Sequence, residues 1–331
     1  MTDTDRVRIH SCLSNQGERR LADDVLDGLT RPFKEIPPKH FYDARGSELF
    51  DQICELPEYY PTRAERQILE DQATAIVQET GAAELVELGS GSAEKARILL
   101  DAMAREGQLH RYIPLDVSEQ ALRQAATELV AEYDELQVDG VVADFERHLD
   151  SVPDRDGGPR LVALLGGTIG NFPPGSRRRL LRGIRSLLEP EDRLLLGTDL
   201  VKDPATLEAA YDDSAGITAE FNRNVLHVIN RELDADFAPD DFDHVAFFDT
   251  QHEWVEMRLR ARQGQSVEIA GLGMRVEFEP GEELRTEISA KFTRSRLESD
   301  YRAAGLALER WYTDPEERFA LSLAAAREPS S

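Results

Sequence analysis

The sequence predicts an α/β fold with a largely parallel sheet, an antiparallel C-terminal hairpin on that sheet, and a second, α+β domain. Short apolar runs alternate with helical patterns over residues 83–199, which is typical of a parallel sheet covered on both faces. Strand-like alternation then runs through residues 244–291, as in antiparallel hairpins. Two further strand-like runs, 306–312 and 319–323, lie near the C-terminus and are separated by a short polar turn.

The N-terminal part of the chain is less regular. Residues 1–20 are polar, and we expect them to be mobile. Residues 41–47 are predicted to be a loop, and residues 48–54 a short helix. Thr62 with Glu65 matches the capping box, so a helix is expected to begin there.

The alternating region is predicted to contain five parallel strands and three helices. Each strand is a short apolar run, and each helix carries apolar residues three and four positions apart. In chain order we expect a strand at 84–88, a helix at 93–105, a strand at 112–115, a helix through Leu122–Val130, strands at 138–142 and 161–165, a helix at 176–188 and a strand at 193–197.

The alternation of strands and helices ends after the fifth predicted strand. Residues 202–233 are predicted to be helical and polar, and glycines at 264 and 271–273 mark turns between antiparallel strands. A helix at 297–305 is then expected to lead into the terminal hairpin.

The turn after the first parallel strand is the strongest sign of a ligand site. Gly89 and Gly91 allow a sharp turn and a close approach to a ligand, at the strand end where open α/β sheets bind nucleotides. A dinucleotide-binding turn requires a small residue at the position of Glu94, and the Gly-Lys-Ser/Thr motif of a P-loop is absent. The turn therefore favours a nucleoside without phosphates, although an ordinary strand–helix turn is an alternative.

The composition excludes several functions. A net charge of −25 argues against nucleic acid and anionic membranes as partners, because phosphate affinity comes from Lys and Arg. No apolar run is long enough for a membrane span, and the first residues lack the regions of a signal peptide, so a cytoplasmic location is expected.

Cys12 and Cys54 form no metal or redox motif. His252-Glu253 begins like a zinc-protease motif but lacks its second histidine, so no metal is expected.

Several residues at predicted strand ends could bind a nucleoside. Asp116 could accept both hydroxyls of a ribose, or could cap the helix ahead of Ser118. Asp144 and Phe145 could hold an adenine by its amino group and its face, or could be a turn residue and a core residue. Lys95 stands in the first turn of a helix, where a cation is unfavourable, so it could reach a carboxylate.

A second group of polar residues could bind a small substrate. Asn171 follows the fourth parallel strand, and its amide can donate and accept, although turn asparagines are common. Glu287 and Ser289 are two residues apart in a predicted strand and should point the same way. They could bind a ring with two nitrogens, or lie on an exposed polar face. Tyr42, Tyr59 and Tyr211 each have a hydroxyl that could donate to a substrate. Alternatively, each could serve only in packing.

The chain resembles class I S-adenosylmethionine-dependent methyltransferases in its glycine turn, Asp116 and terminal hairpin. Ser92 departs from that class, where a third glycine is frequent, but a small residue still fits. The longer motifs resemble more closely the L-histidine Nα-methyltransferases of ergothioneine biosynthesis. These motifs are Phe41–Phe50, Gly167–Asn171, Tyr211–Asp213, Ala219–Asn224, His252–Trp254 and Glu283–Phe292.

The resemblance implies trimethylation of the α-amine of free histidine to hercynine by a monomeric enzyme, with S-adenosylmethionine as methyl donor and no metal. It implies a substrate-binding domain from residues 21–61 and 200–290, and a Rossmann-like S-adenosylmethionine-binding domain from residues 62–199 and 291–331. The implied cofactor contacts are Gly89, Lys95, Asp116, Asp144 and Phe145. The implied histidine contacts are Tyr59, Asn171, Tyr211, Glu287 and Ser289, with Tyr42 and Met257 nearby.

Within this group, Glu287 and Ser289 would bind the imidazole, and Asn171 and Tyr211 would orient the reacting nitrogen. Three other functions are considered. They are a nicotinamide-dependent oxidoreductase, an Nα-methyltransferase for another amino acid, and a catalytically silent ligand-binding relative.

Overall fold

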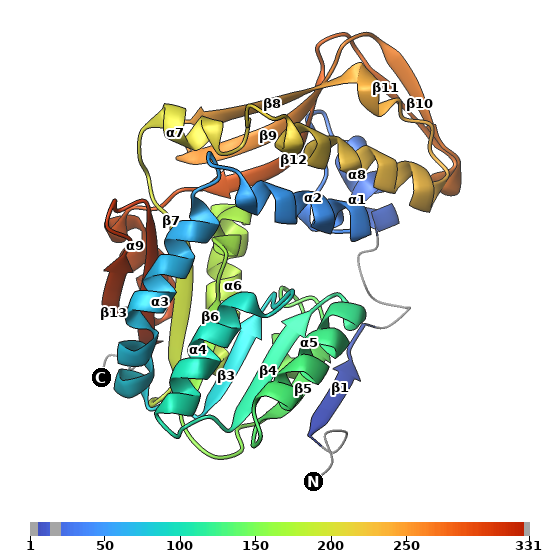
Figure 1. Cartoon of the computed structure of the whole chain (residues 1–331). Helices are drawn as coiled ribbons and strands as arrows, with labels where there is room; N and C mark the ends of the chain where they lie inside the picture. The colour runs from blue at the N-terminus through green and yellow to red at the C-terminus, as the bar shows by residue number, and fades with distance from the viewer. Residues whose placement is uncertain (1–5, 14–20, 328–331) are drawn as a thin grey trace. The chain divides into compact units, whose positions relative to one another are not determined.

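The computed structural model describes residues 6–13 and 21–327. The chain divides into two compact units. Unit 1 comprises Met1–Gln16, Arg63–Leu200 and Phe292–Ser331, and unit 2 comprises Gly17–Thr62 and Val201–Lys291. Figure 1 shows the elements of each unit in the order of the chain.

Unit 1 is built on an eight-stranded sheet with the order β1-β5-β4-β3-β6-β7-β14-β13. Neighbouring strands from β1 to β7 pair in parallel, whereas β14 pairs antiparallel with both β7 and β13. The predicted fold class, with its hairpin at the edge of the sheet, is therefore confirmed. The strands are β1 (Val7–Ser11), β3 (Glu84–Leu88), β4 (Arg111–Asp116), β5 (Gln137–Val142), β6 (Arg160–Leu164), β7 (Arg193–Asp199), β13 (Leu306–Thr313) and β14 (Phe319–Ala326).

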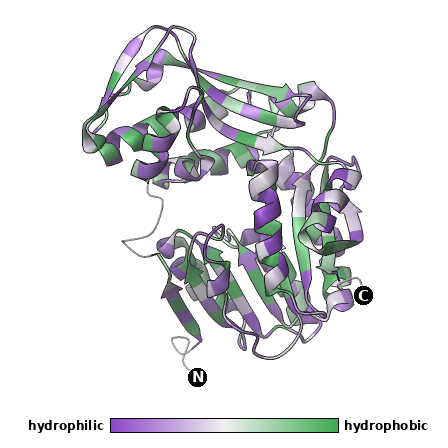
Figure 2. Ribbon diagram, turned by 180° about the vertical axis from the view of Figure 1, so that it is seen from behind, coloured by the Kyte–Doolittle hydropathy of each residue, from purple (hydrophilic) through white to green (hydrophobic). Residues whose placement is uncertain are grey.

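Helices cover this sheet. Apolar side chains of α3, α4 and α5 form one core with the strands, and α6 packs against α9. Figure 2 shows hydrophobic residues along the central strands, as expected for strands that are buried on both faces. The helices are α3 (Pro61–Thr80), α4 (Glu94–Arg105), α5 (Glu119–Glu132), α6 (Pro174–Leu187) and α9 (Arg294–Ala304), with short 3-10 turns at Leu149–Ser151 and Thr168–Asn171.

Three predictions about the N-terminal region need correction. The expected mobility of residues 1–20 is wrong for Val7–Ser11, which pairs in parallel with β5; residues 1–5 and 14–20 lie outside the described residues. This short strand covers the edge of a sheet whose unpaired backbone groups need partners. The predicted loop at 41–47 is also wrong, because a helix begins at Ala44 with the Asp43 side chain accepting from the Gly46 N–H.

The third correction concerns the helix predicted to start at Thr62. It begins one residue earlier, at Pro61, a favourable first helical residue. The Glu65 carboxylate is not part of a capping box, because it binds the loop that follows β6.

Unit 2 combines a four-stranded sheet, ordered β2-β12-β9-β8, with the hairpin β10-β11 and a helical layer. Its core is one apolar cluster drawn from both the sheet and the helices. The strands are β2 (Lys34–Glu35), β8 (Phe242–Asp249), β9 (Trp254–Ala261), β10 (Gln265–Ile269), β11 (Met274–Phe278) and β12 (Glu283–Ala290). The helices are α1 (Leu21–Leu29), α2 (Ala44–Glu55), α7 (Pro204–Ala209) and α8 (Ile217–Leu233), with 3-10 turns at Pro38–Phe41, Pro239–Asp241 and Ala270–Leu272.

Candidate active site

The glycine turn of unit 1 lies directly after β3, and Asp116 at the end of β4 is held against it. Gly89 and Gly91 have positive φ angles of 76° and 49°, which favour glycine. The Gly91 N–H donates to Asp116 Oδ2 at 2.9 Å, and the Ser118 N–H donates to Asp116 Oδ1 at 2.9 Å. The Asp116 carboxylate is therefore fixed beside the turn and keeps further acceptor capacity on each oxygen.

The segment after β5 completes this edge of the sheet. Asp144 Oδ1 accepts from the Glu146 N–H at 2.9 Å, which fixes the turn. The Phe145 ring approaches the glycine turn so closely that a Cβ on Gly89 would lie 3.4 Å from its Cε1 atom. The ends of β3, β4 and β5 thus present a glycine turn, an aromatic face and two carboxylates together.

The N-terminus of α4 faces the same edge of the sheet. Ala93 precedes it with φ 59°, and no side chain of the described residues caps it, so its first N–H groups can bind an anion. These groups fit a nucleoside that carries an amino-acid tail. The acid suits ribose hydroxyls, the ring suits a base, and the helix N-terminus suits a carboxylate.

Lys95 reaches a carboxylate, but a carboxylate of the protein itself. Its ammonium pairs with Glu65 of α3, which is fully buried. The two oxygens of Glu65 also accept from the Gly166 N–H at 2.8 and 2.9 Å. Glu65 therefore ties α4 to the loop after β6. Sequence reasoning missed this role, because the capping-box pattern explained Glu65 locally.

Asn171 ends the 3-10 turn that follows this loop. It is half-buried and lies after the carboxyl end of β6, the neighbour of β3 in the sheet. The hydrogen bonds from Gly166 to Glu65 hold the start of the same loop, so Asn171 is carried by a restrained segment.

A buried acid lies below the glycine turn. Glu87 of β3 accepts a hydrogen bond from the Tyr112 hydroxyl of β4, and both side chains are buried. Burial raises the pKa of Glu87 to about 8, because the charged form loses its hydration. Glu87 is therefore protonated in the folded protein at neutral pH.

In unit 2, a β-bulge decides which way Glu287 points. Arg285 pairs with Arg258, but Glu287 pairs with Met257, so Thr286 is an extra residue in β12. Residues opposite each other share a face of the sheet, and Met257 belongs to the buried core. The bulge thus turns Glu287 and Ser289 towards the core side. Without it, strict alternation would place Glu287 on the face of Arg285.

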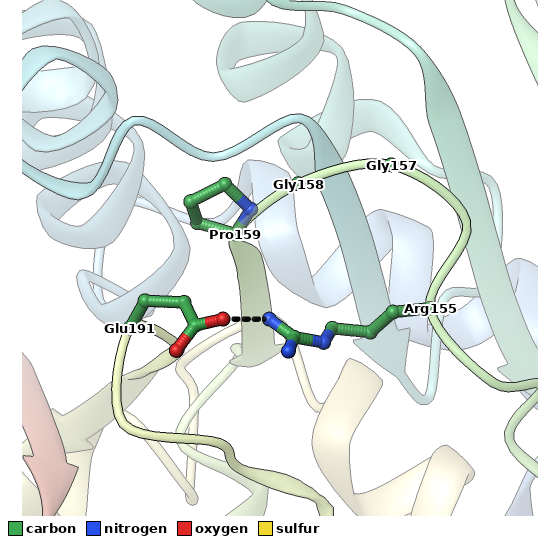
Figure 3. Close-up of a pocket in the computed structure, with 5 residues that line it drawn as sticks. All are labelled: Arg155, Gly157, Gly158, Pro159 and Glu191. Carbon is green, nitrogen blue, oxygen red and sulfur yellow. Dashed lines mark hydrogen bonds and ion pairs between the residues drawn. The ribbon is translucent and has the colours of Figure 1, made fainter.

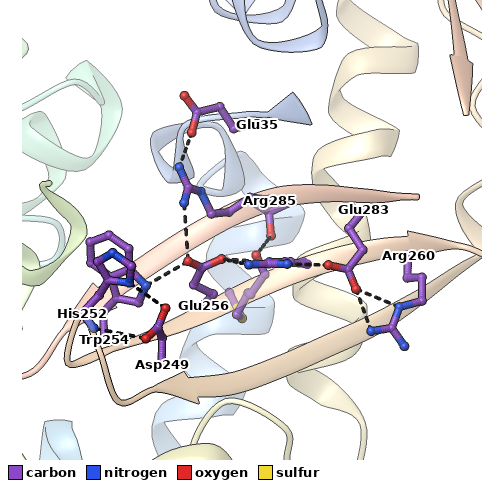
Figure 4. Close-up of polar contacts among 11 residues, drawn as sticks. Glu35, Asp249, His252, Trp254, Glu256, Arg260, Glu283 and Arg285 are labelled. Atoms are coloured by element: carbon purple, nitrogen blue, oxygen red, sulfur yellow. Dashed lines mark hydrogen bonds and ion pairs between the residues drawn. The ribbon is translucent and has the colours of Figure 1, made fainter. Parts of the chain in front are cut away.

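The opposite face of this sheet carries an ion-pair network. The Glu256 carboxylate accepts from Arg258 at 2.6 Å, from Arg285 at 3.4 Å and from the Trp254 indole at 2.9 Å. Figure 4 shows Glu256, Arg285 and Glu283 in this network. The His252 ring stacks on Trp254 with centroids 4.5 Å apart, and hydrogen-bonds Asp249 at 2.7 Å.

Beyond the bulge, Ser289 and Tyr211 lie together. The Tyr211 hydroxyl donates to Ser289 Oγ at 2.8 Å, and the Lys291 ammonium donates to Tyr211 Oη at 2.9 Å and to Ser289 Oγ at 3.0 Å. Lys291 is fully buried. Sequence reasoning included Lys291 in a motif but gave it no role, because a lysine at the end of a strand is usually exposed.

Glu287 has no comparable partner. Its carboxylate makes no hydrogen bond or ion pair in the part of the chain that the structure describes. Burial raises its pKa to about 7, and the positive charge of Lys291 acts in the opposite direction. An unpaired acid at such a position is a candidate for ligand recognition.

Aromatic residues adjoin this acid. The rings of Tyr59 and Tyr211 meet edge to face with centroids 6.3 Å apart. Tyr42 is 47% exposed, and its ring packs on Phe50 at 5.5 Å. Burial and the charge of Glu287 both raise the pKa of the Tyr59 hydroxyl, so that it stays protonated and can donate.

A buried chain of hydrogen bonds supports the bulge. Thr286 donates to Asn222 Oδ1 at 2.6 Å, Asn222 Nδ2 lies 2.8 Å from His244 Nδ1, and His244 Nε2 lies 2.8 Å from the Tyr211 carbonyl oxygen. Burial lowers the pKa of His244, so the neutral ring accepts at Nδ1 and donates at Nε2. The chain links the bulge to the Tyr211 backbone.

A cavity of about 280 Å³ is lined by Arg155, Gly157, Gly158, Pro159 and Glu191 (Figure 3). It lies before the first residues of β6 and β7, at the edge of the sheet opposite the glycine turn. Arg155 and Glu191 form an ion pair across it at 2.6 Å. None of the predicted site residues lines this cavity, so it is not the predicted ligand site.

Within residues 6–13 and 21–327 there is no helix with both the length and the hydrophobicity to span a bilayer. The same residues contain no group of three or more His, Cys, Asp or Glu side chains that could hold a metal ion.

The fold and the glycine-turn site define a class I S-adenosylmethionine-dependent methyltransferase. The class is defined by a parallel sheet that ends in an antiparallel hairpin, with a glycine turn after β3 and an acid after β4. Comparison with known proteins gives the family. Residues 21–326 match the histidine-specific, S-adenosylmethionine-dependent methyltransferases, and the chain belongs to this family. The resemblance inferred from the motifs is therefore confirmed.

Curated relatives agree with this assignment. The chain is 52% identical over 301 residues to the histidine N-alpha-methyltransferase of Mycolicibacterium smegmatis, covering 91% of this chain and 93% of the relative. It is 50% identical over 309 residues to that of Mycobacterium tuberculosis, covering 93% and 96%. Ergothioneine biosynthesis protein 1 of Neurospora crassa is 33% identical over 200 residues, which are 60% of this chain and 23% of that protein.

Proposed function

We propose that the protein transfers three methyl groups from S-adenosylmethionine to the α-amine of free L-histidine and forms hercynine, the first step of ergothioneine biosynthesis. Membership of the histidine-specific family supports the substrate class. The structural observation that carries the proposal is Glu287, an unpaired acid placed beside Ser289 on the core side of β12.

We assign S-adenosylmethionine to unit 1 and the histidine side chain to unit 2. In unit 1, Asp116 binds the ribose, Asp144 and Phe145 bind the adenine, and Gly89 and Lys95 adjoin the amino-acid tail. In unit 2, Glu287 and Ser289 bind the imidazole ring. Tyr42, Tyr59 and Met257 line its surroundings.

Bound S-adenosylmethionine supplies an electrophilic methyl group on a sulfonium. The residues of the chain have to hold the substrate amine, as a free base, in line with that methyl group. An α-amine titrates about one to two units above neutral pH, so its deprotonation costs roughly 1.4–3 kcal/mol. Positioning can contribute up to roughly 7–11 kcal/mol. We therefore assign Asn171 and Tyr211 to orienting the nitrogen and invoke no dedicated base.

We further propose that the enzyme is a cytoplasmic monomer without nucleic-acid or membrane partners. The net charge of −25 supports the monomer and the absence of nucleic-acid and anionic-membrane partners, since it repels phosphate groups and other copies of the chain. Light scattering coupled to size-exclusion chromatography tests the monomer directly, with a mass of 37.2 kDa expected.

Competition among the twenty amino acids tests the proposed reaction. The purified protein is incubated with labelled S-adenosylmethionine and all twenty at equal concentration, and products are identified by mass spectrometry. We expect trimethylated histidine to dominate. Dominance of another methylated amino acid would support the alternative substrate, and the absence of any labelled product would support a silent ligand-binding relative. The family comparison gives no support to either alternative.

A further inference from the structure

We propose that Lys291 is a positioning residue that makes the Ser289 hydroxyl a hydrogen-bond donor towards the substrate, so that the pocket selects the neutral imidazole in one tautomer. This inference rests on the proposed function. It adds a mechanism of specificity that depends on a cation which touches no substrate.

The Lys291 ammonium sets the direction of two of the three hydrogen bonds in this group. An ammonium only donates, so Tyr211 Oη and Ser289 Oγ both accept from Lys291, at 2.9 and 3.0 Å. The Tyr211 hydroxyl in turn donates to Ser289 Oγ at 2.8 Å. Both lone pairs of Ser289 Oγ are then occupied. Its own proton has no acceptor among the described residues and is left for a ligand.

Lys291 is well fixed in this role. It is fully buried, and its Nζ atom lies 4.6 Å from the centroid of the Tyr211 ring, in a cation–π contact. It follows β12 directly, and its backbone N–H donates to the Glu253 carbonyl at 2.7 Å. These contacts and its burial hold the ammonium beside the two hydroxyls.

Glu287 supplies the complementary group. In its ionised form the Glu287 carboxylate only accepts, and Glu287 precedes Ser289 by two residues on the same side of β12. The pair thus offers one acceptor and one donor. A neutral imidazole has one N–H and one bare nitrogen and matches both, in a single tautomer. An imidazolium has two N–H groups, one of which would oppose the Ser289 proton.

Two histidine isosteres test the donor. In 4-thiazolylalanine the ring nitrogen occupies the Nδ1 position of histidine and sulfur the Nε2 position, and in 5-thiazolylalanine the two are exchanged. Only one isomer can place a bare nitrogen against Ser289. We expect the wild-type protein to methylate one isomer with a kcat/KM roughly tenfold higher than that of the other, because a site built to hydrogen-bond discriminates against a ligand without the partner atom.

Lys291→Met removes the cation and keeps a side chain of similar length. We expect the ratio of kcat/KM between the two thiazolylalanine isomers to fall towards one. Without the cation, the hydrogen bond between the Tyr211 and Ser289 hydroxyls can form in either direction. Ser289→Ala should give the same loss with Lys291 in place, which covers the case of a Lys291 variant that folds poorly. Lys202→Met is the matched control, because Lys202 also pairs with a tyrosine, through the Tyr60 hydroxyl at 2.7 Å and the ring at 4.5 Å.

The outcomes separate the two claims. A wild-type protein that does not methylate histidine would overturn the proposed function. A wild-type protein that methylates histidine but has the same isomer ratio as Lys291→Met and Ser289→Ala would overturn only the role of Lys291. A ratio that falls in both variants and is retained in Lys202→Met supports it.

Discussion

Glu287 lies directly opposite Met257 in the β9–β12 register, whereas Arg285, two residues earlier in the same strand, lies opposite Arg258. One inserted residue, Thr286, separates the two pairings. As a result one strand carries an ion-pair network on one face and then a candidate substrate site on the other. The members of the network pair with one another, whereas Glu287 has no hydrogen-bond or ion-pair partner among residues 6–13 and 21–327.

Glu287→Ala should impair histidine binding selectively. Loss of the acceptor leaves the imidazole N–H unpaired, so we expect the KM for histidine to rise roughly 10- to 150-fold, as for the loss of a charged hydrogen bond of about 1.5–3 kcal/mol. The affinity for S-adenosylmethionine should hardly change. Steady-state kinetics with each substrate varied in turn measures both.

Glu283→Ala is the control for this variant. Glu283 lies in the same strand before the bulge and pairs with Arg258 and Arg260 on the other face. Its loss should leave the KM for histidine at the wild-type value. Unaltered histidine kinetics in Glu287→Ala would refute the assignment of Glu287.

Thr286→Val should disturb the bulge without changing the size of the side chain much. It removes the single hydroxyl donor that Asn222 Oδ1 and the Met257 carbonyl share, at 2.6 and 3.1 Å. Unpaired buried acceptors cost about 1–3 kcal/mol, so chemical denaturation should show a loss of stability in that range. We also expect a several-fold rise in the KM for histidine.

Thr80→Val separates these two effects. Thr80 is buried in unit 1 and donates to the Ile76 carbonyl at 2.8 Å. Its replacement should lower stability but leave the KM for histidine unchanged. An equal rise of KM in both variants would show that the effect of Thr286 is not specific to the bulge.

Glu65→Gln should weaken binding in unit 1. The neutral amide loses the ion pair with Lys95 and keeps only one oxygen for the Gly166 N–H. We expect the Kd for S-adenosylhomocysteine to rise roughly tenfold, which corresponds to about 1.4 kcal/mol. Calorimetric titration measures it. Glu70→Gln, on the exposed side of α3 where Glu70 pairs with Arg66, is the control, and an equal Kd in the two variants would contradict the role of Glu65.

Glu87 should make stability depend on pH. Its pKa is raised by burial from 4.5 to about 8 in the folded protein, so between these values the folded state holds a proton that the unfolded state has released. The stabilisation is complete below pH 4.5 and is lost as pH rises through 8, with a slope of up to about 1.4 kcal/mol per pH unit.

Glu87→Gln removes this titration. The free energy of unfolding of the variant minus that of the wild type should therefore increase as pH rises from 5 to 8. Urea denaturation of both proteins at several pH values in this window gives the difference. A difference that is constant with pH would mean that Glu87 does not hold its proton in the folded state.

Local patterns were sufficient for the parallel sheet and for the glycine-turn site. Apolar runs predicted the strands. The carboxyl ends of neighbouring parallel strands lie at the same edge of a sheet, so Gly89, Asp116 and Phe145 were expected to be close together. The side of β12 on which Glu287 lies was predicted only relative to Ser289. The bulge at Thr286 could not be predicted, because it depends on hydrogen bonds to Asn222 of α8 and to β9.

Other features depended on contacts between distant segments. Glu65 and Gly166 are 101 residues apart in the chain, and Lys291 acquires its role from Tyr211, 80 residues earlier. The β1 strand was missed because Val7 and Ile9 alone give a weak apolar pattern, and its pairing with β5 is what orders it.

The most direct test of the central claim is calorimetric titration of Glu287→Ala and Asp116→Ala with histidine and with S-adenosylhomocysteine. We expect opposite losses: Glu287→Ala binds S-adenosylhomocysteine normally and binds histidine at least about tenfold more weakly, whereas Asp116→Ala loses its affinity for S-adenosylhomocysteine. Histidine binding by Glu287→Ala with the wild-type Kd would contradict the assignment of Glu287 to the imidazole.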